Sequence, residues 1–260
     1  MIAAKIGAIM TTAPKFLEAL KTKWRYSETK RTLSNLGRRA SGHTRPIPFH
    51  FLLAQNGIKP KSILHVGANR GQEVRLYNSL GIEGWHVEAI PSIYEKYLLP
   101  ECKNFPDQHP INACLSNIDE TTVKFNISSN KGASSSFLNL GRHAITYPSV
   151  KYVETIELRT KTIDTLVSCG TIPESIEFLL IDAQGAEALI LDGAQSLLSS
   201  KSLLACLIET SVVPLYEGGA TFIDICQRLS KFELHLRRCV FNQQGWTDAL
   251  FMGPWWPQKN

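Results

Sequence analysis

Apolar and polar residues alternate along residues 60–253 in two different rhythms. Short apolar runs, such as EFLLID and LLACLIE, are typical of strands that are covered on both faces of a parallel sheet. Between these runs, apolar residues recur every three or four positions, as they do on one face of a helix. The alternation predicts a doubly wound α/β domain of Rossmann-like type, which we place at residues 49–260.

The same pattern predicts the individual elements. Strands are expected at 62–66, 85–90, 111–116, 122–128, 150–160, 176–182, 203–210, 233–241 and 247–253. Helices are expected at 49–60, 71–81, 91–99, 162–170, 186–200 and 221–230. Strict alternation in 122–128 and 150–160 indicates an antiparallel pair around a loop rich in Ser, Gly and Asn, and the last two strands are expected to form a second such pair.

The first 48 residues differ in character and are predicted to form a basic extension. Residues 13–40 look helical but hold few apolar positions, and residues 41–48 contain one glycine and two prolines, as linkers do. Ten basic and two acidic residues lie within residues 1–50, so the net charge of +5 originates there. Solvated helix faces account for such an arm, and contact with an acidic membrane surface, a polyanion or a protein partner is the alternative. No nucleic-acid partner is predicted for the domain itself.

Cysteine usage and hydropathy bear on the compartment. The six cysteines are scattered and form no CxxC pair, which argues against a disulfide framework or a zinc site. No apolar run approaches the roughly 20 residues that a membrane-crossing helix needs. Lys5 interrupts the short apolar stretch at the start, so this stretch is a poor secretory signal. We therefore expect a cytoplasmic protein.

A turn of small residues follows the first predicted strand and indicates a nucleotide site. The turn reads GANRG and comprises Gly67, Ala68, Asn69, Arg70 and Gly71. Glycines in this place let the backbone turn sharply and approach a ligand closely. Glu88 follows Gly67 by 21 positions, at the end of the second strand, where a carboxylate accepts hydrogen bonds from ribose hydroxyls. The alternative is a tight turn with glycines of purely structural purpose.

The residues of the turn narrow the choice of nucleotide. The chain has neither the GxGxxG of a dinucleotide site nor a GxxxxGK[ST] phosphate loop. Arg70 and Glu73 also stand where phosphates would lie. An adenosyl ligand without phosphates fits better, and this points to S-adenosylmethionine.

Five segments in order resemble the FkbM-type methyltransferases: VGANRGQ, VEAIPSIYEKY, FLLIDAQGAEALILDGA, IETSVVPLYEGG and WTDALFM. The likeness covers about three-quarters of the chain, residues 60–253. Its third segment is the most specific, because the usual family form is close to KIDVEGAELEVLKGA and Asp182, Gly185 and Glu187 match it. The resemblance implies a class I methyltransferase fold with a seven-stranded sheet, S-adenosylmethionine as the methyl donor, and O-methylation of a sugar hydroxyl or a natural product.

Two positions depart from the family pattern. The residue before VGAN is typically an aspartate near the methionine amino group of the cofactor, and here it is His65. A neutral histidine accepts a hydrogen bond but supplies no negative charge, so exchanging His65 for Asp is expected to tighten cofactor binding. Glu73 would lie near the same group. Gln184 replaces a common glutamate and keeps hydrogen-bonding capacity without the charge.

The candidate cofactor residues follow from the turn, the strand ends and the resemblance. Asn112 and Ala113 are included because they end the third strand, where the adenine ring is usually held. The predicted cofactor-binding residues are His65, Gly67, Ala68, Asn69, Gly71, Glu73, Glu88, Ala89, Asn112, Ala113 and Asp182.

Methyl transfer to an alcohol needs alignment of the acceptor and a group that takes the hydroxyl proton. Asp182 ends a predicted strand and is the first candidate for the base, with a cap on the following helix as its alternative role. Glu187 lies in the first turn of that helix, where the helix dipole alone favours a carboxylate. Glu209 ends a buried strand and either lines the acceptor site or pairs with a cation. His143 is the fourth candidate, with polar surface as its alternative.

A loop and a turn are predicted to meet the acceptor. The loop 130–147 carries Ser134, Ser135, Ser136 and Arg142, which suit a hydroxyl-rich ligand, and its alternative is a flexible, solvated loop. Tyr216 in LYEGG offers a stacking surface for a sugar, or else packs beneath its turn. Gln184 is assigned to the substrate as well. The carboxylates and histidines lack the close spacing of metal ligands, so no metal is predicted.

The sequence thus predicts an S-adenosylmethionine-dependent O-methyltransferase of a carbohydrate or another hydroxyl-bearing metabolite. One alternative is a methyltransferase with a nitrogen or nucleic-acid acceptor. The end of the fourth strand reads DAQGAE, however, where nucleic-acid enzymes of this fold often carry an NPPY-like motif. The other alternative is a non-catalytic binding module that keeps the cofactor fold, which His65 and Gln184 would favour.

Overall fold

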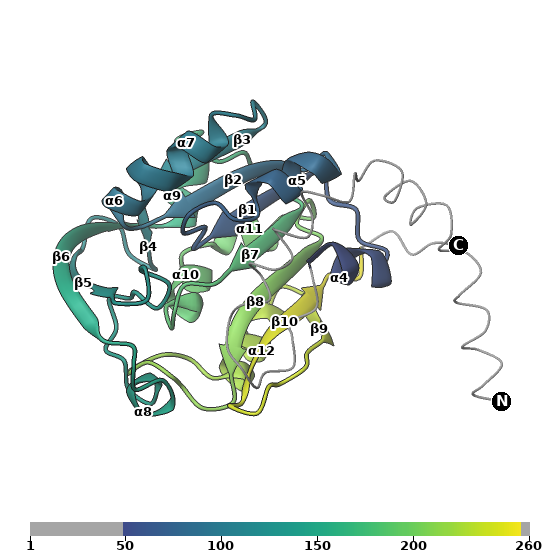
Figure 1. The fold of residues 1–260 in the computed structure, drawn as a ribbon. Coiled ribbons are helices and arrows are strands. Elements are labelled where there is room, and N and C mark those ends of the chain that lie inside the picture. Colours follow the sequence, from purple (N-terminus) through teal and green to yellow (C-terminus); the bar gives the residue numbers. More distant parts are fainter. Residues whose placement is uncertain (1–48, 256–260) are drawn as a thin grey trace, which may run out of the picture. The chain divides into compact units, whose positions relative to one another are not determined.

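The computed structural model describes residues 49–255, and the predicted N-terminal extension lies outside them. The main sheet has seven strands in the order β3-β2-β1-β7-β8-β10-β9 (Figure 1). Its strands are β1 (Ser62–Val66), β2 (Glu83–Glu88), β3 (Gln108–Asn112), β7 (Phe178–Ile181), β8 (Ala205–Ser211), β9 (His235–Arg238) and β10 (Trp246–Met252). Neighbouring strands from β3 to β8 pair in parallel, and β10 runs antiparallel to both β8 and β9. The predicted mostly parallel, seven-stranded sheet is confirmed.

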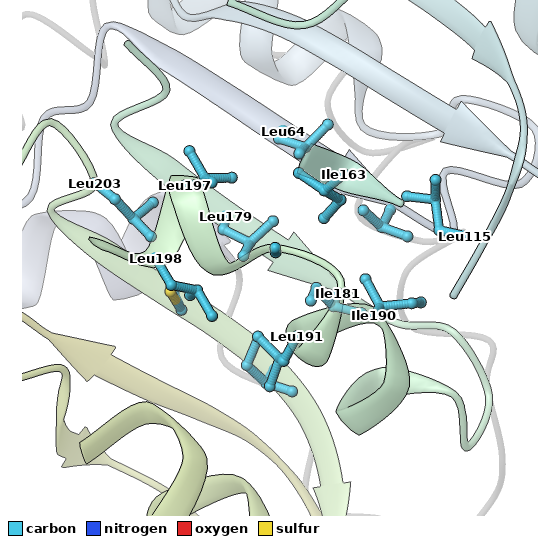
Figure 2. Close-up of a cluster of buried hydrophobic side chains, with 14 of the residues drawn as sticks. Leu64, Leu115, Ile163, Leu179, Ile181, Ile190, Leu191, Leu197, Leu198 and Leu203 are labelled. Carbon is cyan, nitrogen blue, oxygen red and sulfur yellow. The ribbon is translucent and has the colours of Figure 1, made fainter. Parts of the chain in front are cut away.

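Helices cover both faces of this sheet, because successive residues of its central strands point to opposite sides. In β7, Phe178 packs into one hydrophobic cluster and Leu179 into another, and both are fully buried. Figure 2 shows how side chains from α9, α10 and α11 lie over Leu64 of β1 and Leu179 of β7. The covering helices are α4 (Phe49–Gln55), α5 (Val74–Leu80), α6 (Pro91–Ile93), α7 (Leu99–Cys102), α9 (Ile163–Ser168), α10 (Glu187–Asp192), α11 (Gln195–Ser199) and α12 (Phe222–Ser230). The buried central strands of the sheet correspond to the apolar runs without polar alternation that predicted strands in the sequence.

Two helices begin at polar residues that satisfy the free N–H groups of the first turn. Thr221 accepts a hydrogen bond from the backbone N–H of Asp224, whose side chain accepts one from the N–H of Thr221 in return. This reciprocal capping box starts α12 one residue after the predicted boundary. The side chain of Thr162 caps α9 by accepting a hydrogen bond from the backbone N–H of Thr165.

Two predicted elements are each divided in the structure. The strand expected at 111–116 is wrong as a single strand, because the chain leaves the main sheet at Ala113 and continues as β4 (Cys114–Leu115), which pairs with β6. The helix expected at 186–200 is divided into α10 and α11, because the carbonyl of Gly193 accepts the N–H of Asp164 and so contacts α9. In both cases a tertiary contact overrides the local periodicity.

An insertion between β4 and α9 forms a second sheet. Its strands β5 (Thr122–Ser128) and β6 (Tyr152–Lys161) are antiparallel, as predicted, and β4 pairs with β6 in parallel. The intervening loop holds the short helix α8 (His143–Thr146). Figure 1 shows β5, β6 and α8 together on the side of the main sheet away from α4 and β9. The segment 91–102 also contains a π-helical turn, η1 (Tyr94–Leu98), between α6 and α7.

None of the helices within residues 49–255 combines the length and the apolar character that crossing a bilayer requires.

Candidate active site

The site lies where the order of strands reverses, between β1 and β7. The chain runs from β1 outward to β2 and β3 and then returns to the other side of β1 as β7. The carboxyl ends of β1 and β7 are adjacent, and the N–H of Asp182 donates to the carbonyl of Val66 at 3.1 Å. Ligands of open α/β sheets bind at such a reversal, because the connections diverge there.

The turn after β1 contacts the end of β7 through the backbone. Gly67 has φ +85°, and a Cβ added to it would lie 1.9 Å from the carbonyl oxygen of Asp182. The N–H groups of Gly67 and Ala68 both donate to the carbonyl of Val87, at 3.0 and 2.9 Å. Asn69 has φ +49° and completes the sharp turn. Only glycine fits at position 67, and its fit brings the predicted cofactor turn against the predicted base.

Glu88 ends β2 with its side chain buried, at 5% exposure. Its carboxylate accepts the N–H of Ile90 at 2.8 Å, together with the backbone N–H groups of Asn69 and Ala89. Burial raises the pKa of Glu88 to about 7, against the opposing effect of these three hydrogen bonds. An ionised carboxyl has about four lone-pair positions, so acceptor capacity is left for a ligand hydroxyl.

The other predicted cofactor residues at the ends of β2 and β3 surround Glu88. Asn112 pairs with Glu88 in register, and its side chain donates to the carbonyls of Glu88 and Ala89 at 2.8 and 3.3 Å. The N–H of Ala113 donates to the carbonyl of Glu88 at 3.2 Å. These residues therefore lie at one edge of the site, as predicted from the strand ends.

His65 has a partner within the protein. Its side chain is 5% exposed, and Nδ1 lies 3.2 Å from the hydroxyl of Tyr77 on α5. Burial and, to a smaller extent, the neighbouring His86 lower the pKa of His65 to about 3, so the ring is neutral. The pKa of Tyr77 is raised by burial and then by the charge of Glu73, which stands at the start of α5. A role of His65 and Glu73 at the cofactor ammonium stays a prediction.

An amide bridge joins two carboxyl groups at the ends of β7 and β8. The side-chain N–H2 of Gln184 donates to Oδ1 of Asp182 at 2.5 Å and to Oε2 of Glu209 at 2.9 Å. Its Oε1 accepts the hydroxyl of Tyr216 at 2.7 Å. Gln184 itself has φ +54°, a left-handed conformation that few side chains adopt. Both N–H donors of this amide are engaged by the protein, so only its oxygen is left for the predicted contact with substrate.

The surroundings of Glu209 raise its pKa. Burial raises the pKa of Glu209 well above its ordinary value, and the charge of Asp182 raises it further. Asp248, which stands opposite Glu209 in the register of β10 and β8, acts in the same direction. The raised pKa of Glu209 favours its protonated form. Among the described residues, Glu209 forms no ion pair, so the cation predicted as its alternative partner is not found there.

Glu187 holds the loop that carries the bridge. It is the first residue of α10, is 8% exposed, and accepts the N–H groups of Ala183 and Gly185 at 3.0 and 3.1 Å. Burial, with a smaller contribution from the charge of Asp182, raises the pKa of Glu187 to about 7. The N-cap of α10 is Ala186, so Asp182 does not cap this helix and its alternative role is wrong. Glu187, a predicted catalytic residue, is occupied with the backbone of the loop.

Tyr216 packs inside the protein and touches the loop from the other side. It is 4% exposed, so the prediction of a stacking surface for a sugar is wrong and the alternative of packing beneath its turn is confirmed. A Cβ added to Gly185, whose φ is +99°, would lie 2.6 Å from Cβ of Tyr216. The tyrosine hydroxyl reaches the Gln184 amide, and its ring lies 5.4 Å from that of His143.

The serine loop is ordered by its own hydrogen bonds. Ser134, Ser135 and Ser136 are buried, at 7%, 7% and 1% exposure, so a flexible, solvated loop is wrong. The hydroxyl of Ser135 accepts the N–H of Ser128 at 2.9 Å, and that of Ser134 accepts the side-chain amide of Asn130, also at 2.9 Å. The hydroxyl of Ser136 accepts the N–H of Leu138. These hydroxyls support the loop, and their predicted contact with an acceptor stays a prediction.

The two remaining predicted residues lie in very different surroundings. His143 is 5% exposed, burial lowers its pKa, and its Nδ1 has no hydrogen-bond partner within residues 49–255. It is therefore not polar surface. Arg142 precedes it and is exposed, at the start of α8. The structure joins His143 to Tyr216 and the amide bridge, and it leaves Arg142 at the surface.

Asp248 is a charged group of this site that the sequence did not reveal. It belongs to WTDALFM and reaches Glu209 only because β10 inserts between β8 and β9. Within residues 49–255, no group of three His, Cys, Asp or Glu side chains is placed to hold a metal ion.

The sequence model of the methyltransferase FkbM domain matches residues 65–242. No curated protein matches the chain in sequence. A methyltransferase FkbM from Methylobacillus flagellatus is similar in structure, with a TM-score of 0.47 and 14% identity over 75% of this chain. The match spans 44% of the length of that protein.

Two further solved structures are similar over most of the chain. One is a TehB-like SAM-dependent methyltransferase from Corynebacterium glutamicum, with a TM-score of 0.40, 10% identity, and coverage of 95% of this chain and 98% of that one. The other is a 1,6-didemethyltoxoflavin-N1-methyltransferase from Burkholderia thailandensis with bound S-adenosylhomocysteine. It has a TM-score of 0.42, 10% identity, and coverage of 96% and 89%.

Proposed function

Because this chain belongs to the methyltransferase FkbM domain family, we propose that it transfers a methyl group from S-adenosylmethionine to a hydroxyl of a carbohydrate or natural-product acceptor. The observation that carries this proposal is the amide-bridged pair of Asp182 and Glu209, set directly beside the glycine turn of β1. It brings a carboxylate that can take a proton to the point where the fold binds its ligand.

The residues present fit an adenosyl cofactor. Glu88 keeps acceptor capacity for a ribose hydroxyl, and Asn112 and Ala113 lie beside it, where the adenine ring would be held. The backbone of Gly67 offers close approach, since a side chain there would collide with the end of β7. The turn has neither the GxGxxG nor the GxxxxGK[ST] pattern of a phosphate cradle.

S-adenosylmethionine, when bound, supplies an electrophilic methyl group on a sulfonium. The protein then has two tasks, which are to align the acceptor oxygen with that methyl group and to accept the hydroxyl proton. We assign the proton to Asp182, the member of the pair that lies against the glycine turn. Gln184 fixes its position through a hydrogen bond to Oδ1, and the raised pKa of Glu209 disfavours a second negative charge beside it. Glu88, Asn112 and the Gly67 turn would hold the cofactor, and Asp182 would take the hydroxyl proton as the C–O bond formed and the C–S bond of the sulfonium broke to give a neutral sulfide.

Exchange of Asp182 for Asn tests this assignment. The assay incubates the protein with S-adenosylmethionine and a panel of sugars, glycosides and phenols, and it measures S-adenosylhomocysteine. We expect Asp182→Asn to bind S-adenosylhomocysteine as wild type does, while turnover falls about 100- to 10,000-fold, the range for loss of a general base. Asp192→Asn is the matched control, because Asp192 pairs with Arg228 on the surface and should leave turnover unchanged.

Two results would contradict the proposal. Equal turnover of Asp182→Asn and wild type would remove Asp182 as the base. Methylation of amines but of no hydroxyl compound in a wider panel would replace O-transfer by N-transfer.

A further inference from the structure

Arg70 lies in the turn between β1 and α5 and is stacked on an aromatic ring. Its guanidinium carbon is 4.0 Å from the ring centroid of Tyr97, which projects from the π-helical turn η1. Stacking of this kind holds the planar guanidinium in one orientation. Arg70 follows Asn69, whose N–H binds the Glu88 carboxylate, so the cation is fixed next to the proposed cofactor site.

The donors of this cation are not satisfied by the protein. Nε of Arg70 is buried and has no hydrogen-bond partner within residues 49–255. None of the ion pairs formed by the described residues includes Arg70. A buried donor on a charged group is costly to leave unpaired, and most such groups in proteins have a partner.

The groups around Arg70 do not supply the missing partner for its charge. Lys96 lies on the same ring, with Nζ 5.4 Å from the centroid of Tyr97, and it too forms no ion pair with a described residue. Glu101 borders the same turn, where its Cβ would lie 3.6 Å from a Cβ added to Gly71. Its carboxylate is already bound by Arg75 at 2.6 Å. Arg70 and Lys96 therefore both lie on the ring of Tyr97, whereas the neighbouring carboxylate of Glu101 is paired with Arg75.

We propose that Arg70, stacked on Tyr97 and assisted by Lys96, is an anion-binding subsite that takes a carboxylate or phosphate of a bound ligand. A guanidinium binds such groups through paired N–H donors. The proposal rests on the proposed function, because S-adenosylmethionine carries a carboxylate at its amino-acid end. An acidic acceptor is the second source of the same chemistry.

Calorimetry on the full chain separates these sources. Wild type and Arg70→Met are titrated with S-adenosylhomocysteine and with its decarboxylated analogue, which keeps the amine and lacks only the carboxylate. If the subsite holds the cofactor, Arg70→Met weakens S-adenosylhomocysteine about 10- to 100-fold, the loss of a charge-assisted hydrogen bond, and leaves the analogue unchanged. Arg70→Lys should fall between the two, because it keeps the charge and loses the planar stack.

The second arm applies if S-adenosylhomocysteine binds both proteins equally. Inorganic phosphate is then titrated into the complexes with S-adenosylhomocysteine, and binding to wild type but not to Arg70→Met assigns the subsite to the acceptor. Lys103→Met is the control for charge alone, since Lys103 is an exposed lysine just after α7.

Three results would overturn the subsite. These are an equal loss for both cofactor analogues, an equal loss in Lys103→Met, and no effect of Arg70→Met in either arm. Failure of wild type to bind S-adenosylhomocysteine would instead refute the proposed function, so the two failures are distinguishable.

Discussion

Exchange of Gly67 for Ala tests how the glycine turn after β1 is joined to the end of β7. The substitution adds one methyl group, which would lie 1.9 Å from the carbonyl oxygen of Asp182, at a residue with φ +85°. Both the left-handed backbone conformation and the lack of space disfavour the substitution. Gly170→Ala is a matched control, because Gly170 has φ +76° and nothing lies within 4 Å of an added Cβ.

The expected cost follows from these two effects. A left-handed conformation costs a residue with a Cβ about 1–2 kcal/mol, and Gly170→Ala should show this alone. The overlap at Gly67 requires the ends of β1 and β7 to separate, and overpacking of this kind costs about 1–3 kcal/mol more. We therefore expect a loss of about 2–5 kcal/mol for Gly67→Ala.

Denaturation in urea, followed by circular dichroism, measures the free energy of unfolding of each variant. Binding of S-adenosylhomocysteine is measured in parallel, and it should weaken in Gly67→Ala because the Asp182 carbonyl is displaced. If Gly67→Ala is no less stable than Gly170→Ala, the two strand ends are not in contact as described, and the reasoning about this joint fails.

Three further substitutions test single features of the site. Burial raises the pKa of Glu88 from 4.5 to about 7. Unfolding measurements should therefore show a stabilisation of about 3 kcal/mol at most, which is present below pH 4.5 and lost as the pH rises through 7. Glu88→Gln should remove this pH dependence. Gln184→Leu should cost about 2–4 kcal/mol in a denaturant titration, because it removes the hydrogen bonds with Asp182, Glu209 and Tyr216. Gln195→Leu, whose amide donates only to backbone carbonyls, should cost less than about 1 kcal/mol. His65→Asp is expected to tighten S-adenosylhomocysteine in calorimetry, and equal or weaker binding would remove His65 from the cofactor ammonium.

Much of the fold follows from the sequence, because buried parallel strands have a simple apolar signature. β1 and β5 begin and end at the predicted residues. The adjacency of the turn at Gly67 and of Asp182 also follows, since both stand at carboxyl ends of neighbouring strands in one sheet. The position of Glu88 at the end of β2, beside this turn, follows in the same way, and its contact with a ribose stays a prediction.

The details of the site depend on contacts that no local pattern contains. Gln184 bridges Asp182 and Glu209 only because its backbone is left-handed. A single glutamine in a sequence does not predict that conformation. The serine loop looks solvated in sequence, yet its hydroxyls satisfy buried backbone groups. Asp248 enters through the register of β10 against β8, which depends on the whole sheet.

The most direct test of the account is a calorimetric titration of the wild-type chain with S-adenosylhomocysteine. The cofactor turn, the buried Glu88 and the bridged carboxyl pair predict one binding site per chain, with a dissociation constant in the range typical of enzymes for their ligands, about 1 µM to 1 mM. Binding should strengthen about tenfold between pH 6 and 8, as Glu88 with its pKa of about 7 becomes ionised. Absence of binding at millimolar ligand would contradict the central claim that this site holds an adenosyl cofactor.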